Sequence, residues 1–205
     1  MGSMPPDLRL SLSRAIRPRQ DPANRDEEQL ATPTMTRVMS PVELKRLLPT
    51  LIELLRETVN GGASLGFLPP LGLEEAREYW LSLRPDLEAG SRLLILARTG
   101  SGIVGSGQLA MATLPSSRHR AEVQKLFVSP AQRGLGVGRA LMAALHEAAQ
   151  QHGRSLLLLN TRRGNPAEDF YKRLGYREVG VVPGWTVGPA GERYDHVALY
   201  RELSL

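Results

Sequence analysis

Cysteine is absent from the 205-residue chain, and aromatic residues and long apolar runs are scarce. Without cysteine the chain has no disulfide framework, no thiolate nucleophile and no cysteine-ligated zinc. The longest apolar runs, Leu156–Leu159 and Leu93–Ala97, fall far short of the roughly 18 residues of a membrane-spanning helix. The first residues also lack the apolar core of a signal peptide. We therefore expect a cytoplasmic protein that has no membrane as a partner.

The charge is mildly basic, with 26 Lys and Arg against 21 Asp and Glu and a net charge of +5. The basic residues are spread along the chain, whereas a nucleic-acid-binding face should concentrate them. Only 5% of the residues are aromatic, which leaves few surfaces on which bases could stack. We therefore expect no nucleic acid as a partner. A smaller polyanion remains open as a ligand.

Residues 1–35 differ in composition from the rest of the chain. They are rich in Pro, Arg, Asp and Ser and show no sustained apolar period. Such a segment cannot bury much surface, so we predict a flexible N-terminal extension. Residues 36–205 are predicted to form a single domain.

Apolar periodicity and turn residues predict the elements of this domain. Ser40 is placed to cap a first helix, which Gly61 stops, and a second helix follows and ends near Gly90. The expected strands are 37–39, 92–98, 103–113, 119–128, 156–159, 176–181 and 194–203, and two further helices run from the glycine-rich turn to Gly153 and over 166–174. The order βααβββαβαββ is an α/β fold with a mixed sheet.

The strand 119–128 is expected to alternate in side-chain direction along its whole length. Glu122, Gln124, Leu126 and Val128 would then lie on one face. Val123, Lys125 and Phe127 would lie on the other.

A glycine-rich turn joins this strand to the next helix. Gly134, Gly136 and Gly138 let the backbone approach an anion closely, and the helix N-terminus adds favourable potential for phosphate. Arg133 and Arg139 add positive charge at the rim. The spacing fits neither the dinucleotide fingerprint nor the mononucleotide P-loop. The pattern therefore predicts a pyrophosphate cradle of another kind.

Two motifs together resemble the GNAT superfamily of N-acetyltransferases. Arg133, Gly136 and Gly138, which follow a strand carrying Glu122, resemble its acetyl-coenzyme A motif. Downstream, residues 167–176 resemble its A-x-x-[FL]-Y-x-x-x-G-[FY] helix around Tyr171. One departure is Gly164, which replaces the asparagine common seven positions before the tyrosine. The resemblance implies a mixed, mostly antiparallel sheet flanked by helices, and acetyl-CoA as cosubstrate with no metal.

A narrower resemblance points to the tabtoxin resistance acetyltransferases, which acetylate an amino group of a β-lactam amino-acid toxin. It covers about residues 37–203 and depends on segments at 57–67, 120–126 and 179–185 together with Tyr171. Asn160 stands where related resistance enzymes carry an aspartate. The acceptor implied is a small amine or amino-acid-like molecule, possible toxins and antibiotics included.

The resemblance also implies roles for individual residues. Glu122 is in the position of the general base and Tyr171 in that of the acid. The coenzyme would be bound by residues of the strand end and the glycine-rich turn, and the acceptor by residues of the first interhelical loop and the C-terminal half. The coenzyme set is Leu126, Phe127, Val128, Arg133, Gly134, Leu135, Gly136, Val137, Gly138 and Arg139, and the acceptor set is Ser64, Phe67, Asn160 and Trp185.

Other functions are weighed against this one. Gly62–Gly66 spells the G-x-S-x-G of hydrolases, but a helix and not a strand precedes Ser64. His119, His146, His152 and His196 show no metal-ligand spacing. A peptide or protein N-acetyltransferase, a non-catalytic acetyl-CoA-binding module and a homodimer all stay open.

Overall fold

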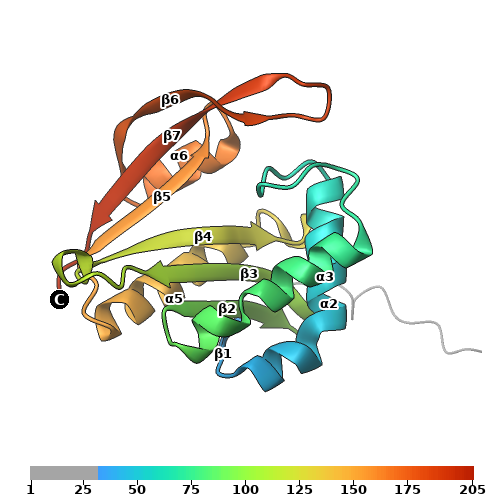
Figure 1. Ribbon diagram of the computed structural model, residues 1–205, viewed down its shortest axis with the longest axis horizontal. Coiled ribbons are helices and arrows are strands. Elements are labelled where there is room, and N and C mark those ends of the chain that lie inside the picture. The colour runs from blue at the N-terminus through green and yellow to red at the C-terminus, as the bar shows by residue number, and fades with distance from the viewer. Residues whose placement is uncertain (1–31) are drawn as a thin grey trace, which may run out of the picture.

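The computed structural model describes residues 32–205, which contain a seven-stranded mixed sheet in the order β1-β2-β3-β4-β5-β7-β6 (Figure 1). The predicted extension lies outside the described residues except for its last few positions. The strands are β1 Thr34–Val38, β2 Arg92–Thr99, β3 Gly102–Met111, β4 Arg120–Val128, β5 Leu156–Arg162, β6 Arg177–Val187 and β7 Arg193–Glu202. Only the β4–β5 pair is parallel. The predicted mixed, mostly antiparallel sheet is confirmed.

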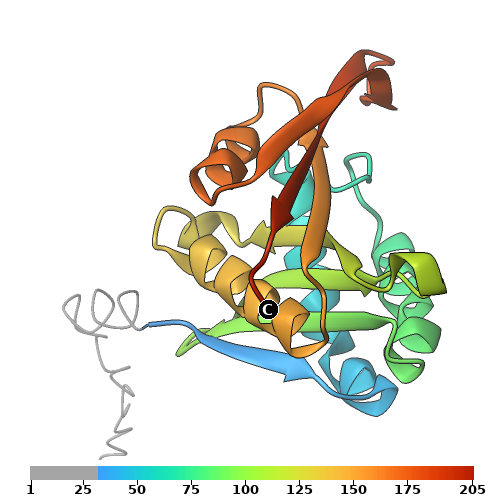
Figure 2. The same cartoon turned by 90° about the vertical axis from the view of Figure 1, so that its left-hand side faces the viewer.

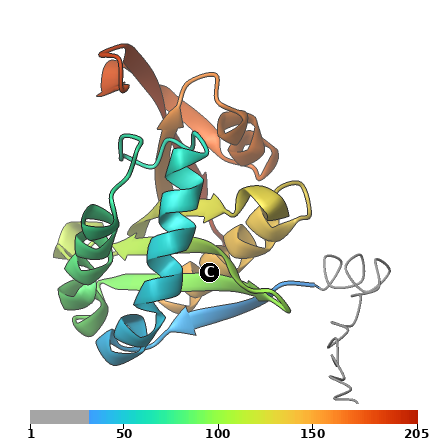
Figure 3. The ribbon, with the colours of Figure 1, turned by 90° about the vertical axis from the view of Figure 1, so that its right-hand side faces the viewer.

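Helices cover both faces of the sheet. They are α2 Pro41–Asn60, α3 Leu73–Ser82, α4 Arg84–Glu88, α5 Val137–Gln151 and α6 Pro166–Arg173. Figures 2 and 3 show α5 and α2 on opposite sides of β1–β4. Two apolar clusters result, one between the sheet and α5, the other between the sheet and α2, α3 and α4.

The first two helices illustrate how local sequence sets the element ends. Ser40 caps α2 by accepting from the Glu43 amide at 3.2 Å, and the Glu43 carboxylate accepts from the Met39 amide at 2.9 Å. This resembles a capping box, except that Glu43 reaches the residue before the cap. The second predicted helix is in fact two, α3 and α4, with a break at Leu83. Pro85 explains the break, because its ring lacks an N–H and clashes with the preceding turn of a continuing helix.

Three strands extend at least three residues beyond their predicted ends, and one of them is β5, which continues past Leu159 to Arg162. β1 begins at Thr34, inside the segment expected to be an extension, because Met35 pairs with Ala97 and packs against the α5-side core. β6 continues past Pro183 to Val187 with a register shift between Val182 and Thr186. Proline is tolerated there because β6 is an edge strand and the residue lies at an irregularity of the ladder.

The expected alternation along β4 is wrong beyond Gln124. A β-bulge inserts one residue in β4 opposite Gly107, between the pairs Ser106–Phe127 and Gln108–Gln124, and Lys125 has a left-handed φ of 47°. The extra residue reverses the phase of the pleat. Leu126 therefore packs on the α5 side, together with Val123, while Phe127 joins the α2–α3 side.

The β4 and β5 strands separate soon after they meet. Their parallel ladder has three pairs, from Arg120–Leu156 to Glu122–Leu158, although both strands continue beyond it. In Figure 1, β5 and the β6–β7 hairpin rise away from β4. This separation opens the sheet, so that side chains from both of its faces can reach the gap between β4 and β5.

Candidate active site

A cleft of about 990 Å³ lies where β4 and β5 separate. Its walls come from the α2–α3 loop, the end of β4, the glycine-rich turn, β5, α6 and the β6–β7 hairpin. Of the residues predicted from sequence to form the site, it is lined by Ser64, Glu122, Leu126, Phe127, Val128, Arg133, Gly134, Gly136, Gly138, Arg139, Asn160, Tyr171 and Trp185. Segments that are far apart in the chain, from Thr58 to His196, thus meet around one space.

The glycine-rich turn has the form of an anion cradle. Three backbone amides of the turn make no hydrogen bond to a backbone carbonyl of the described residues, those of Gly134, Leu135 and Gly136. The helix α5 follows at Val137, and no side chain caps its N-terminus. Gly134 and Gly136 have φ values of +80° and +82°, and a Cβ at either position would meet open space. Free amides at a helix N-terminus favour phosphate oxygens.

Positive charge surrounds this cradle. Arg133 and Arg139 line the cleft as expected, and Arg173 from the end of α6 joins them. Opposite charge raises the local concentration of an anionic ligand and stabilises it when bound. The residues present therefore fit the pyrophosphate of a coenzyme such as acetyl-CoA.

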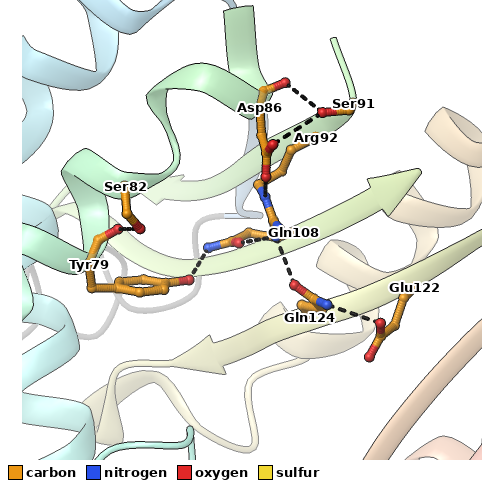
Figure 4. Close-up of polar contacts among 8 residues, drawn as sticks. All are labelled: Tyr79, Ser82, Asp86, Ser91, Arg92, Gln108, Glu122 and Gln124. Atoms are coloured by element: carbon orange, nitrogen blue, oxygen red, sulfur yellow. Dashed lines mark hydrogen bonds and ion pairs between the residues drawn. The ribbon is translucent and has the colours of Figure 1, made fainter. Parts of the chain in front are cut away.

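Glu122 lies on the α2–α3 side of the sheet, at the last β4–β5 pair. Its Oε2 accepts from Gln124 Nε2 at 3.0 Å (Figure 4), and Asn160 Nδ2 donates to its Oε1 at 3.5 Å. The sequence did not predict that Asn160 would contact Glu122. Two amide groups therefore contact the one carboxylate in the cleft that was predicted to take a proton.

Tyr171 approaches the same cleft from the α5 side of the sheet. It is 8% exposed, packs edge-on against Phe170 and Tyr176, and makes no hydrogen bond to the described residues through its hydroxyl. Burial raises the pKa of Tyr171 well above its usual range, so the hydroxyl keeps its proton at neutral pH. It is therefore available as a donor, whereas Glu122 faces the cleft from the other side.

Lys125 fixes the α2–α3 loop to the β4 bulge. Its Nζ donates to the Leu65 carbonyl at 2.7 Å and lies 5.3 Å and 5.6 Å from the ring centroids of Phe67 and Tyr79. Burial, and to a lesser degree repulsion from Arg92, lower the pKa of Lys125, while Glu122 acts in the opposite direction. The loop that carries Ser64 is thus attached directly to the strand that carries Glu122.

Three predicted site residues do not line the cleft. Val137 is 2% exposed and belongs to the α5-side core, because the helix turns its side chain inward. Phe67 packs against Tyr79 and Lys125. Leu135 is 46% exposed at the tip of the turn. Phe67 lies in the α2–α3 loop and is not among the residues that line the cleft.

Several cleft residues were missed by sequence reasoning. His196, Thr186, Gln124 and Lys125 all line it. His196 of β7 pairs with Arg162 of β5, and its Nδ1 lies 3.0 Å from Asn160 Oδ1. The one available signal was for Gln124, whose predicted position on the same face as Glu122 is correct.

Asn165, next to Gly164, caps α6 by accepting from the Ala167 amide at 3.0 Å.

Two further features bear on function. Over residues 32–205, no cluster of three or more His, Asp or Glu side chains is arranged to hold a metal ion. None of the helices in this part of the chain is both long and apolar enough to cross a membrane.

Comparison with known proteins gives consistent results. The acetyltransferase (GNAT) domain family matches residues 90–178. An IAA acetyltransferase of Azospirillum brasilense is 30% identical over 142 residues, which are 69% of this chain and 83% of that protein. An uncharacterized N-acetyltransferase of Methanocaldococcus jannaschii is 44% identical over 69 residues, but the match spans only 33% of this chain and 30% of that protein.

A solved structure extends the comparison to the whole domain. The crystal structure of a proposed phosphinothricin N-acetyltransferase superposes with a TM-score of 0.68 at 25% identity, covering 84% of this chain and all of that one. The family match, by comparison, spans residues 90–178 alone. The fold is therefore shared over most of the chain.

Proposed function

The chain belongs to the GNAT family of acetyltransferases and is an acyltransferase enzyme, and on that premise we propose that it moves the acetyl group of acetyl-CoA directly to the amino group of a small molecule. Bound acetyl-CoA would supply the acetyl thioester. Absence of cysteine excludes an acetyl-cysteine intermediate, so direct transfer to the amine is the remaining route among the family's chemistries.

One observation carries this proposal. Glu122 and Tyr171 reach a single cleft from opposite faces of the sheet, through the opening between β4 and β5, and the phosphate cradle lies on the same cleft. An acid and a base on either side of one acyl group is the arrangement that amine acylation needs.

The steps assigned to the chain's residues follow from their positions. Glu122 takes a proton from the acceptor ammonium, which is required because a protonated amine has no lone pair for attack. Tyr171 gives a proton to the departing thiolate. The edge of β4 at Leu126–Val128 faces the opening, where β5 no longer pairs with it. Its backbone N–H groups are placed to polarise the thioester carbonyl.

The coenzyme would be held mainly by backbone groups. Gly134, Gly136 and the first amides of α5 would bind the pyrophosphate, with Arg133, Arg139 and Arg173 around it. Val137 would contribute through its amide alone, since its side chain is buried.

The acceptor side favours a small amine over a protein chain. The α2–α3 loop with Ser64 and the hairpin with Trp185 line the same cleft as Glu122, and Lys125 donates to the loop at the Leu65 carbonyl. The similar proteins named for IAA and phosphinothricin are named for small molecules. Amino-acid-like molecules, including toxins of the tabtoxin type, are therefore the first acceptors to assay.

The test is amine-dependent release of the coenzyme thiol. Purified protein with acetyl-CoA is offered amino acids, small amines and short peptides, and each product is identified by mass. We expect release with at least one small amine and an N-acetyl product. Binding of acetyl-CoA without turnover on any amine would instead support a binding module, and turnover on peptides alone would support a peptide acetyltransferase.

A hydrolase control uses the G-x-S-x-G segment. Cleavage of an ester without coenzyme, abolished in Ser64→Ala, would replace acetyl transfer as the assigned activity. The structure gives Ser64 no strand before it, as α2 ends at Asn60, so we expect no such cleavage.

A further inference from the structure

Glu122 is held by two side-chain amides whose own orientation is fixed from behind. Gln124 Nε2 lies 3.0 Å from one carboxylate oxygen and Asn160 Nδ2 lies 3.5 Å from the other. An ionised carboxylate only accepts hydrogen bonds. Both amides must therefore turn their NH₂ groups toward Glu122 and their oxygens away from it.

Arg92 fixes the amide of Gln124. Its Nη1 donates to Gln124 Oε1 at 2.8 Å and to Gln108 Oε1 at 3.0 Å, and its Nε donates to Asp86 at 3.1 Å (Figure 4). Because a guanidinium only donates, Gln124 has to present its oxygen to Arg92. Its NH₂ group then points to Glu122, and the positive charge behind it polarises that donor.

His196 fixes the amide of Asn160 in the same way. Asn160 Oδ1 lies 3.0 Å from His196 Nδ1, and His196 Nε2 lies 3.2 Å from the Thr186 hydroxyl. The oxygen of Asn160 requires a proton on Nδ1. Nε2 of the neutral ring then accepts from Thr186. Burial, and secondly the charge of Arg162, lower the pKa of His196, which favours this neutral form.

The ring of His196 is also held in place from the cleft side. Trp185 stacks on it with a centroid distance of 6.0 Å and an interplanar angle of 21°. The imidazole thus has one nitrogen on Asn160, the other on Thr186 and one face on an indole. Both of its nitrogens are engaged by the protein, so neither is left to act directly on the acceptor.

The charged groups around Glu122 come from several elements. Arg92 of β2 lies behind Gln124, and Lys125 of β4 interacts with the carboxylate through its charge. His196 of β7 lies behind Asn160, with Arg162 of β5 beyond it. Asp86 carries a negative charge and accepts from Arg92 Nε at 3.1 Å.

We propose that Arg92 and His196 are positioning residues that act on Glu122 through Gln124 and Asn160, holding the carboxylate in one orientation for proton transfer. This rests on the proposed function, in which Glu122 is the base. Asn160 accordingly takes no part in proton transfer itself. Its amide accepts from His196 through the oxygen and donates to Glu122 through the nitrogen. An ionised carboxylate at this position could not donate to Glu122.

Three substitutions of His196 separate this role from direct catalysis. Asparagine keeps an N–H donor at the place of Nδ1, glutamine keeps one at the place of Nε2, and leucine keeps neither. We expect His196→Asn to retain most of the amine-dependent turnover. His196→Gln and His196→Leu should lose about tenfold in kcat, with the acidic limb of the pH–rate profile raised by roughly one pH unit, since one hydrogen bond to the carboxylate is lost.

The Arg92 side is tested by Gln124→Met, which keeps the length of the side chain but not its amide. It should raise the acidic limb by a similar amount and leave the affinity for acetyl-CoA unchanged, as Gln124 lies away from the cradle. Thermal unfolding of each variant confirms that it folds. Glu122→Gln is the reference for complete loss of the base.

The outcomes are distinguishable. If Glu122→Gln keeps full turnover, the proposed function fails and the positioning role fails with it. If Glu122→Gln is inactive while His196→Leu and Gln124→Met keep the wild-type pH profile, only the positioning role is overturned. Equal losses in His196→Asn and His196→Leu would likewise overturn it. If His196→Gln kept its turnover in that case, His196 would act through Nε2.

Discussion

Glu122 and Leu158 form the last pair of the parallel ladder between β4 and β5. Both strands continue beyond this pair but no longer pair with each other. The candidate base therefore lies at the point where the sheet opens. Every other feature of the site follows the same opening, with the free edge of β4, the cradle at its end and Tyr171 on the far side.

Gly136→Val tests the cradle. The residue has a φ of +82° and its Cβ would face open space, so the valine side chain would occupy the place proposed for the pyrophosphate. We expect acetyl-CoA affinity, measured by calorimetry, to fall by at least about tenfold.

Gly153→Val is the matched control for Gly136→Val. Gly153 follows the other end of α5, has a φ of +66° and likewise has open space around a Cβ. Both substitutions should cost roughly 1–2 kcal/mol of stability through left-handed backbone, but only Gly136→Val should lose the coenzyme. Wild-type affinity in Gly136→Val would place the pyrophosphate elsewhere.

Tyr171→Phe tests the acid. Because burial raises the pKa of Tyr171, its hydroxyl is protonated throughout the neutral range and its removal deletes a proton donor. We expect kcat to fall by on the order of 10²-fold, with little change in the KM of the amine, as measured by thiol release.

Tyr176→Phe serves as the control for Tyr171→Phe. Tyr176 is a buried neighbour whose hydroxyl pairs with His146 and which does not line the cleft. Its substitution should affect stability more than turnover. If the two variants lose activity equally, the tyrosine hydroxyl of α6 has no specific part in the reaction.

Lys125→Met tests the attachment of the acceptor loop. The variant loses the 2.7 Å bond to the Leu65 carbonyl and the contacts with the rings of Phe67 and Tyr79. A less restrained loop should raise the KM of the acceptor several-fold, while acetyl-CoA affinity stays the same. Lys45→Met, at an exposed position of α2, should change neither, and an unchanged acceptor KM in Lys125→Met would show that the loop needs no such attachment.

The lowered pKa of His146 makes the stability of the folded chain depend on pH. Burial, and secondly Arg201, lower the pKa of His146 from 6.5 to about 4. Between these two values the unfolded chain binds a proton that the folded chain does not, so stability falls as the pH drops from about 6.5 toward 4. The thermal midpoint of His146→Gln should therefore decline less steeply between pH 7 and 5, and equal slopes would contradict the neutral, buried form.

The order of the elements could be predicted because it depends on local patterns. Leu residues at helical spacing, the Ser40 cap and the glycine turns are each contained in a short window. The bulge at Lys125 could not be predicted, because it depends on how β4 lies against β3, where the register skips Gly107. A Cβ on Gly107 would clash with Leu145 at 2.8 Å. One inserted residue then changed the face of Leu126 and Phe127.

The candidate site was predictable in part for the same reason. Glu122, the glycine-rich turn and Tyr171 belong to contiguous motifs, whereas the partners of Glu122 come from distant strands. Arg92 reaches Gln124 across 32 positions and His196 reaches Asn160 across 36. No local window contains such pairs, so their association depends on the strand order of the sheet.

The most direct measurement compares wild type and Glu122→Gln in amine-dependent release of the coenzyme thiol, with acetyl-CoA affinity measured on the same samples. If Glu122 takes the proton of the acceptor amine, turnover falls by on the order of 10² to 10⁴ while the affinity stays unchanged. Equal turnover in the two proteins would contradict the account.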